Sequence, residues 1–173
     1  ESKPLYWKPE PGIGYTVARR ADGGMIVTFT DLSPATVKHW HDFALEHLLG
    51  SDRLTRNMYD LRQIIEIPES AVHTAMEVNS DPAARNIRLA VVVNNEKLMN
   101  AVREIYYSVS PETSAVMKIF TDMDGAEAWL SRPLDQTLVL DVLGAGIPEM
   151  LGELRRFYRQ GLAAKLSTIA RAA

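Results

Sequence analysis

The stretch that decides the fold runs from Tyr59 to Val72 and reads YDLRQIIEIPESAV. Its first residues end a strand predicted over 55–61, and a helix predicted over 68–79 begins with Pro68, Glu69 and Ser70. Parallel α/β sheets present their functional edge where a strand runs into a helix in this way. We therefore expect the functional edge of the sheet at this joint.

Strands and helices alternate on both sides of the joint. The other predicted strands are 15–20, 25–30, 87–93 and 115–120. Predicted helices begin after the cap Ser33 and end at Gly50, cover 96–107, and begin again with a capping box from Asp124 to Glu127 that leads to Leu130. The aliphatic run 87–93 is typical of a strand covered on both faces.

The first two strands flank Asp22-Gly23-Gly24, whose glycines are expected to supply the positive φ of a tight hairpin turn. Strands that alternate with helices connect by crossovers, so the last four should be mainly parallel. The pattern predicts an α/β fold: a five-stranded mixed sheet with an N-terminal antiparallel hairpin, four alternating helices and a C-terminal amphipathic helix.

Three segments follow from composition: an extended arm over 1–14, the α/β domain over 15–133, and a helical extension over 134–173. Residues 138–143 fit either a strand or a helical turn.

From Pro148 an apolar stripe predicts a long amphipathic helix; it consists of Leu151, Leu154, Tyr158, Leu162, Leu166 and Ile169. This helix would pack on its own core, pair with a second copy to form a homodimer, or lie on an anionic surface.

Composition excludes several classes of protein. The 173 residues carry a formal net charge of −3, so no global field would attract nucleic acid. The chain has no cysteine, which excludes disulfides and thiolate sites. No apolar run approaches the roughly 20 residues of a membrane span, and residues 1–11 lack the pattern of a signal peptide. We expect a cytoplasmic protein with neither a nucleic-acid partner nor a membrane span.

The order of elements resembles the STAS domain, the module of bacterial anti-sigma-factor antagonists and of anion-transporter tails. In that family the third strand runs into Asp-Leu-Ser, a few apolar residues and then Asp-Ser-Ser-Gly-Leu. Here Asp60-Leu61-Arg62 and the segment 67–72 follow the same spacing, and Ser70 falls at the position of the phosphorylatable serine. Pro68 and Glu69 replace the family's Asp-Ser, and Ala71 replaces its Gly. The resemblance covers roughly residues 15–132, and the segment 120–130 looks like a divergent STAS-like branch of unknown function.

The resemblance implies a non-enzymatic module that binds a protein partner or a small ligand and needs no cofactor. The partner would dock beside the joint, where Asp60, Arg62, Glu69 and Ser70 are expected to be exposed. Asp60 and Arg62 are expected to form an ion pair or to orient the loop. A separate apolar pocket is expected near two aromatic residues, Trp40 and Tyr59.

Two chemical alternatives rest on histidines. Ser70 and His73 lie three residues apart at the start of a helix, which would suit a small hydrolase or transferase, although such a pair is common on helix surfaces. His39 and His41 would point about 160° apart on one helix and could not share a metal ion. We predict no metal site, and we expect His39 on a solvated charged face with Asp42 and Glu46.

Overall fold

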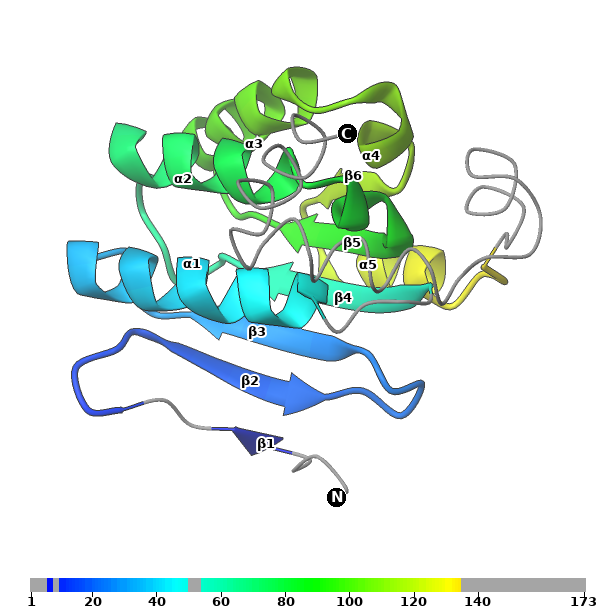
Figure 1. Cartoon of the computed structure of the whole chain (residues 1–173), viewed down its shortest axis with the longest axis horizontal. Helices are drawn as coiled ribbons and strands as arrows, with labels where there is room; N and C mark the ends of the chain where they lie inside the picture. The colour runs from blue at the N-terminus through cyan, green and yellow to red at the C-terminus, as the bar shows by residue number, and fades with distance from the viewer. Residues whose placement is uncertain (1–5, 8–9, 50–53, 135–173) are drawn as a thin grey trace, which may run out of the picture.

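Six strands follow one another across a single sheet in the order in which they occur in the chain (Figure 1). The computed structural model describes residues 6–7, 10–49 and 54–134. The strands are β1 (Tyr6–Trp7), β2 (Tyr15–Arg19), β3 (Met25–Phe29), β4 (Thr55–Asp60), β5 (Ile87–Val92) and β6 (Met117–Phe120). β1 and β3 both run antiparallel to β2, whereas β3, β4, β5 and β6 run parallel to one another.

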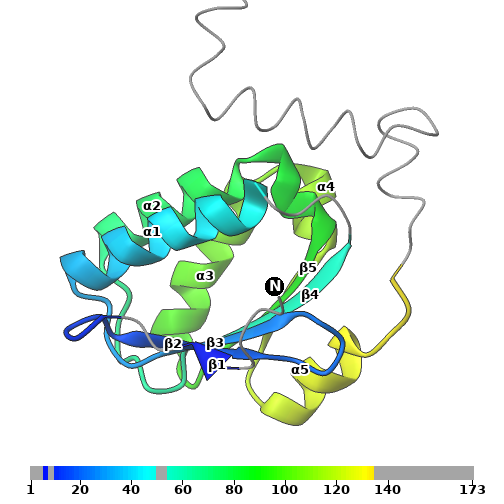
Figure 2. The same cartoon turned by 60° about the horizontal axis from the view of Figure 1, so that its bottom comes forward.

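Helices cover both faces of the sheet, but unequally (Figure 2). The connections between parallel strands lie on one face and comprise α1 (Pro34–Leu49), α2 (Glu69–Asn79), the 3-10 helix η1 (Pro82–Asn86), α3 (Glu96–Ser108) and α4 (Pro111–Ala115). α5 (Met123–Leu130) follows β6 and packs on the opposite face. The main core therefore lies between the sheet and α1 to α4.

The predicted α/β class is confirmed, with its N-terminal antiparallel hairpin and its parallel strands alternating with helices. The arm adds a short strand, β1, so the described sheet has six strands rather than five. The last strand was predicted to begin at Ala115, but this residue ends α4, which Ser110 caps by accepting a hydrogen bond from the Thr113 amide at 3.3 Å. η1 and α4 have five residues each, too few to produce a hydrophobic period.

β5 is covered on both faces, as its aliphatic run predicted. Leu89 and Val91 belong to the main core, whereas Ala90 and Val92 pack in a second cluster with Leu130 of α5. α1 contributes its predicted apolar stripe, in which Trp40, Ala44 and Leu48 are buried. Alternation along the strand and helical periodicity thus account for both cores.

The hairpin turn uses its glycines differently from the prediction. Gly23 has the expected positive φ of 87°, but Gly24 does not. A Cβ atom on Gly24 would instead overlap the backbone carbonyl oxygen of Arg56 at the start of β4. Gly24 is therefore required by the close approach of two chain segments that are distant in sequence.

The predicted capping box at 124–127 is wrong. α5 is capped by Asp122, whose carboxylate accepts a hydrogen bond from the Gly125 amide at 2.7 Å. The Glu127 carboxylate instead receives two hydrogen bonds from the Arg20 guanidinium, at 2.6 and 2.7 Å. Arg20 is buried and also pairs with Asp22, so this cluster ties α5 to the hairpin.

His39 does not lie on a solvated charged face, which corrects a further prediction. Its Nδ1 lies 2.7 Å from the hydroxyl oxygen of Tyr15, which is buried on β2. His41 is the histidine that contacts Asp42, at 3.0 Å. A helical wheel could not show this, because the β2 residue that receives His39 lies 24 positions away in the chain.

The predicted amphipathic helix from Pro148, and the homodimer based on it, lie outside the described residues. Of the predicted extension over 134–173, only Leu134 is described. Within the described ranges, no helix combines the length and the apolar character needed to cross a membrane.

Candidate functional site

The loop between β4 and α2, residues 61–68, lies at the carboxyl end of the parallel strands and is held from the neighbouring β5–α3 loop. The Leu61 amide donates to the Val92 carbonyl at 2.9 Å, continuing the β4–β5 pairing beyond β4. The side-chain amide of Asn94 donates to the Arg62 carbonyl, and that of Asn95 donates to the Ile65 carbonyl at 3.4 Å. These contacts fix the path of the loop backbone.

Asp60 and Arg62 form the expected ion pair where β4 ends. Arg62 Nε and Nη2 each lie 2.9 Å from a different carboxylate oxygen of Asp60, and the Arg62 amide donates to the same carboxylate at 3.1 Å. Burial acts to raise the pKa of Asp60, but the hydrogen bonds and charge of Arg62 outweigh it and lower this pKa below its ordinary value. The carboxylate therefore stays ionised and anchors the loop.

The expectation that Asp60 is exposed is wrong. Its side chain is only 9% exposed, whereas that of Arg62 is 46% exposed. Asp60 is the last residue of β4 and points to the face that α5 covers, together with Met58. It supports the surface from beneath and is not part of it.

The outer side of the joint carries one large apolar side chain among polar ones. Ile65 is 82% exposed, and Glu69 and Ser70 in the first turn of α2 are exposed as predicted. Together with Arg62 these residues form what we call the joint surface. Ile65 was not predicted as a site residue, because in the sequence it is one of several apolar residues in 64–67, of which Ile64 is buried.

Ser70 and His73 both face solvent on α2. The carbonyl oxygen of Ser70 accepts a hydrogen bond from the Thr74 hydroxyl at 2.9 Å, the usual contact of a threonine within a helix. The two side chains are placed on an open helix surface rather than in a cleft, where catalytic groups are normally brought together.

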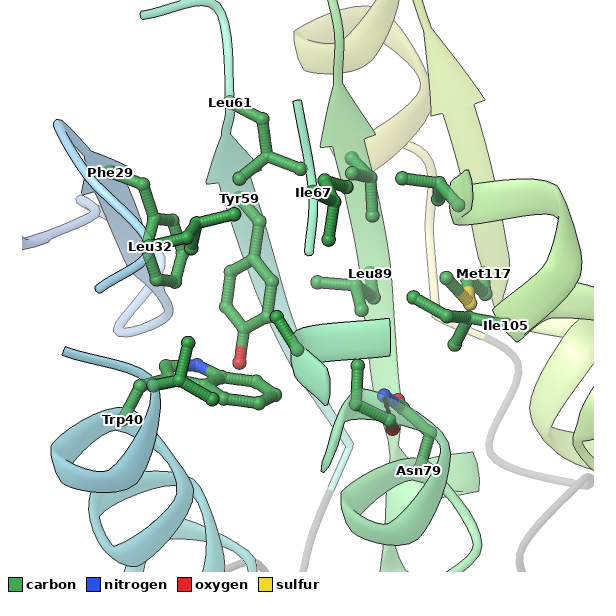
Figure 3. Close-up of a pocket in the computed structure, with 15 residues that line it drawn as sticks. Phe29, Leu32, Trp40, Tyr59, Leu61, Ile67, Asn79, Leu89, Ile105 and Met117 are labelled. Atoms are coloured by element: carbon green, nitrogen blue, oxygen red, sulfur yellow. Dashed lines mark hydrogen bonds between the residues drawn. The ribbon is translucent and has the colours of Figure 1, made fainter. Parts of the chain in front are cut away.

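Trp40 and Tyr59, the two predicted pocket residues, both line a cavity beneath α1 and α2 (Figure 3). Their rings meet edge to face with centroids 6.0 Å apart, and both rings contact Phe29. The cavity is also bounded by apolar residues of the sheet, the loop and three helices; these are Leu32, Val37, Leu61, Ile67, Ala71, Ala75, Leu89, Val91, Val102, Ile105 and Met117, with Asn79 at the end of α2.

Two polar groups from different elements meet in this apolar cavity. Burial raises the pKa of the Tyr59 hydroxyl to about 12, although the nearby indole N–H of Trp40 acts to lower it. The Trp40 Nε1 atom is buried, and despite this proximity it has no partner with the geometry of a normal hydrogen bond. At neutral pH Tyr59 therefore keeps its proton, and the Trp40 N–H lies close to the hydroxyl oxygen without forming a well-aligned hydrogen bond.

The described residues do not include a group of three or more His, Asp or Glu side chains placed to hold a metal ion. Asn94 and Asn95, which hold the loop, were missed as supporting residues. The sequence offered only a weak signal for them, because an asparagine before a helix is first expected to cap it. Asn95 does cap α3, accepting from the Leu98 amide at 2.9 Å, while its amide group reaches Ile65.

The sequence matches no model of a known protein family, and a search among curated proteins also finds no match. The joint surface and the cavity are the two candidate sites in the described part of the chain.

Proposed function

We propose that this protein is a non-enzymatic, STAS-like binding module that docks a protein partner on the joint surface. The observation that carries the proposal is Ile65, a large apolar side chain that is 82% exposed on a loop whose backbone is held in place. Among the described residues, only Tyr107 has a large apolar side chain of similar exposure, 78%.

The loop is organised before any partner arrives. A disordered loop would lose conformational entropy on binding, about 1–2 kcal/mol for each backbone residue that becomes fixed. Here Asn94 and Asn95 hold the loop carbonyls, and the Asp60–Arg62 pair holds its first turn. A partner that covers Ile65 would therefore gain apolar burial with little ordering cost.

The surroundings of Ile65 fit the common anatomy of a binding patch, an apolar centre with a polar rim. Arg62 contributes a guanidinium that is half exposed, and Glu66, Glu69 and Ser70 contribute further exposed polar groups. The STAS resemblance independently points to this joint, since Ser70 falls at the family's regulatory position. These two arguments converge on one stretch of chain, residues 62–70.

The test uses the full chain with two matched substitutions, Ile65→Asp and Tyr107→Asp. A partner is first captured from the native source, purified, and titrated against the wild-type protein and both variants. We expect Ile65→Asp to weaken binding at least tenfold, because a charge would have to be desolvated at the centre of the patch. Tyr107→Asp should leave the affinity within about twofold.

Both side chains are exposed, so both variants should unfold within about 0.5 kcal/mol of the wild type, as a thermal melt can check. Equal affinity of the Ile65→Asp variant and the wild type would show that the partner docks elsewhere. In that case the STAS resemblance would extend to the fold pattern and not to the mode of binding.

A further inference from the structure

We propose that the cavity beneath α1 and α2 binds a small, uncharged, mainly apolar molecule about the size of one aromatic ring, which carries one hydrogen-bond acceptor. The cavity has a volume of about 70 Å³ and lies between the sheet and the helices, with Trp40 and Tyr59 in its wall (Figure 3). This site is separate from the joint surface, and the proposal does not depend on a protein partner.

The volume and the lining argue for an organic ligand rather than water. A single buried water needs roughly 10–15 Å³ on this measure, so the cavity exceeds the space for one water several times over. Fourteen of its fifteen lining residues are apolar or aromatic, and the other is Asn79. A water cluster would find few polar partners there, whereas an apolar ring would gain contacts with the wall.

The lining also selects against charge. None of the fifteen residues is acidic or basic, so an ionised ligand would lose its hydration without gaining a counter-ion. The Tyr59 hydroxyl does not provide one, because burial raises its pKa to about 12. The ligand class is therefore neutral at physiological pH.

The cavity wall contains a buried hydrogen-bond donor, the indole N–H of Trp40. The Trp40 side chain is 6% exposed, and its Nε1–H lacks a partner with normal hydrogen-bond geometry. Figure 3 shows the Tyr59 hydroxyl, which can donate as well as accept, beside this indole, in a wall whose other polar side chain is Asn79. A ligand oxygen placed there would satisfy a buried donor, which favours an acceptor-bearing ring over a pure hydrocarbon.

The route that we propose into the cavity runs between α1 and the β4–α2 loop. Six lining residues are only partly buried, and three of these belong to the two segments on either side: Leu32 before α1, Val37 in its first turn and Ile67 at the end of the loop. Side-chain rotations at such positions occur quickly and need no unfolding of the sheet. On this proposal a small molecule exchanges with solvent through movements of these side chains.

The experiment is a titration of the isotope-labelled full chain followed by amide and indole N–H spectra. Phenol and benzene serve as neutral probes, and benzoate serves as a charged control with the same ring. We expect phenol to shift the Trp40 indole signal and the amides of Ala71 and Ala75 in a saturable way, to bind more tightly than benzene, and to raise the thermal midpoint. Benzoate should leave these signals unchanged.

Two filling variants and one matched control complete the test. Ala75→Leu adds bulk to the cavity wall and should weaken phenol binding at least tenfold, and Ala75→Met supplies a more adaptable side chain should the leucine prevent folding. Ala128→Leu makes the same change on an exposed position of α5 and should bind phenol like the wild type. Three outcomes would overturn the proposal: no saturable shift at Trp40 in the wild type, equal shifts with benzoate, or a filled variant that binds phenol normally.

Discussion

Single residues at the joint divide into those that support it and those that face outward. Asp60 is buried and holds Arg62, while Ile65 and Ser70 are exposed on the same short stretch of chain. A substitution at Asp60 would therefore disturb the loop itself. A substitution at Ser70 changes the outer surface alone, which makes it the better probe of binding.

At this scale we predict that Ser70→Asp changes the free energy of unfolding by less than about 1 kcal/mol but weakens the docking of a partner. The new carboxylate gains from the positive end of the α2 dipole, and the neighbouring Glu69 opposes it. A thermal melt and a binding titration measure the two effects, with Ser70→Ala as the uncharged control. Unchanged affinity of the aspartate variant would place Ser70 outside the interface.

Among the elements, the hairpin is joined to its neighbours by contacts that are distant in sequence. Gly24 allows the turn to approach β4, and Arg20 connects the end of β2 to Glu127 on α5. These contacts fix the antiparallel edge of the sheet relative to the parallel strands. The hairpin is therefore part of the cooperative structure of the domain.

We predict that Gly24→Ala lowers the free energy of unfolding by at least about 2 kcal/mol, because its Cβ would force the β3 and β4 backbones apart. The matched change Gly23→Ala meets no atom within 4 Å and involves only a positive φ, so it should cost about 1 kcal/mol. Denaturant melts of both variants measure the difference. Equal losses would mean that the backbone contact at Gly24 does not limit stability.

For the whole molecule, several paired carboxylates make stability depend on pH. The hydrogen bonds and charge of Arg20 lower the pKa of Glu127. Burial acts to raise the pKa of Asp22, but the contacts with Arg20 outweigh it and lower this pKa. Burial likewise acts to raise the pKa of Asp60, and the contacts with Arg62 outweigh it. Because each folded-state pKa lies below its unfolded value, near 4, the unfolded chain binds more protons in acid. The stability that these ion pairs contribute is therefore fully present above about pH 5, and it is lost as the pH falls through the folded-state pKa values.

We predict that Glu127→Gln lowers the free energy of unfolding at pH 7 by about 1 kcal/mol or less, since Glu127 is half exposed. The gap to the wild type should shrink as the pH falls through the lowered folded-state pKa of Glu127, below which the carboxyl group is protonated in both states. Denaturant melts between pH 3 and 7 measure it, with Glu104→Gln on an exposed part of α3 as the control. A gap that does not change with pH would show that the Arg20–Glu127 charge pair is not its cause.

The sequence by itself determined the order and type of the main elements, because periodicity, helix caps and turn residues act within a few positions of one another. Pro68 and Glu69 mark the start of α2, and the run 87–93 indicates a strand covered on both faces. Trp40 and Tyr59 could be expected near each other, since a helix and a strand predicted to adjoin both direct large aromatic residues toward the core.

Only the tertiary structure decided which residues of the joint are buried, how the loop is held, and where space remains. Asn95 reaches Ile65 across 30 positions and Arg20 reaches Glu127 across 107, distances over which local pattern carries no information. The cavity is even harder to predict from the sequence, because its volume of about 70 Å³ is the space left over after many side chains pack against one another. The size of this empty space depends on the positions of all of those side chains at once.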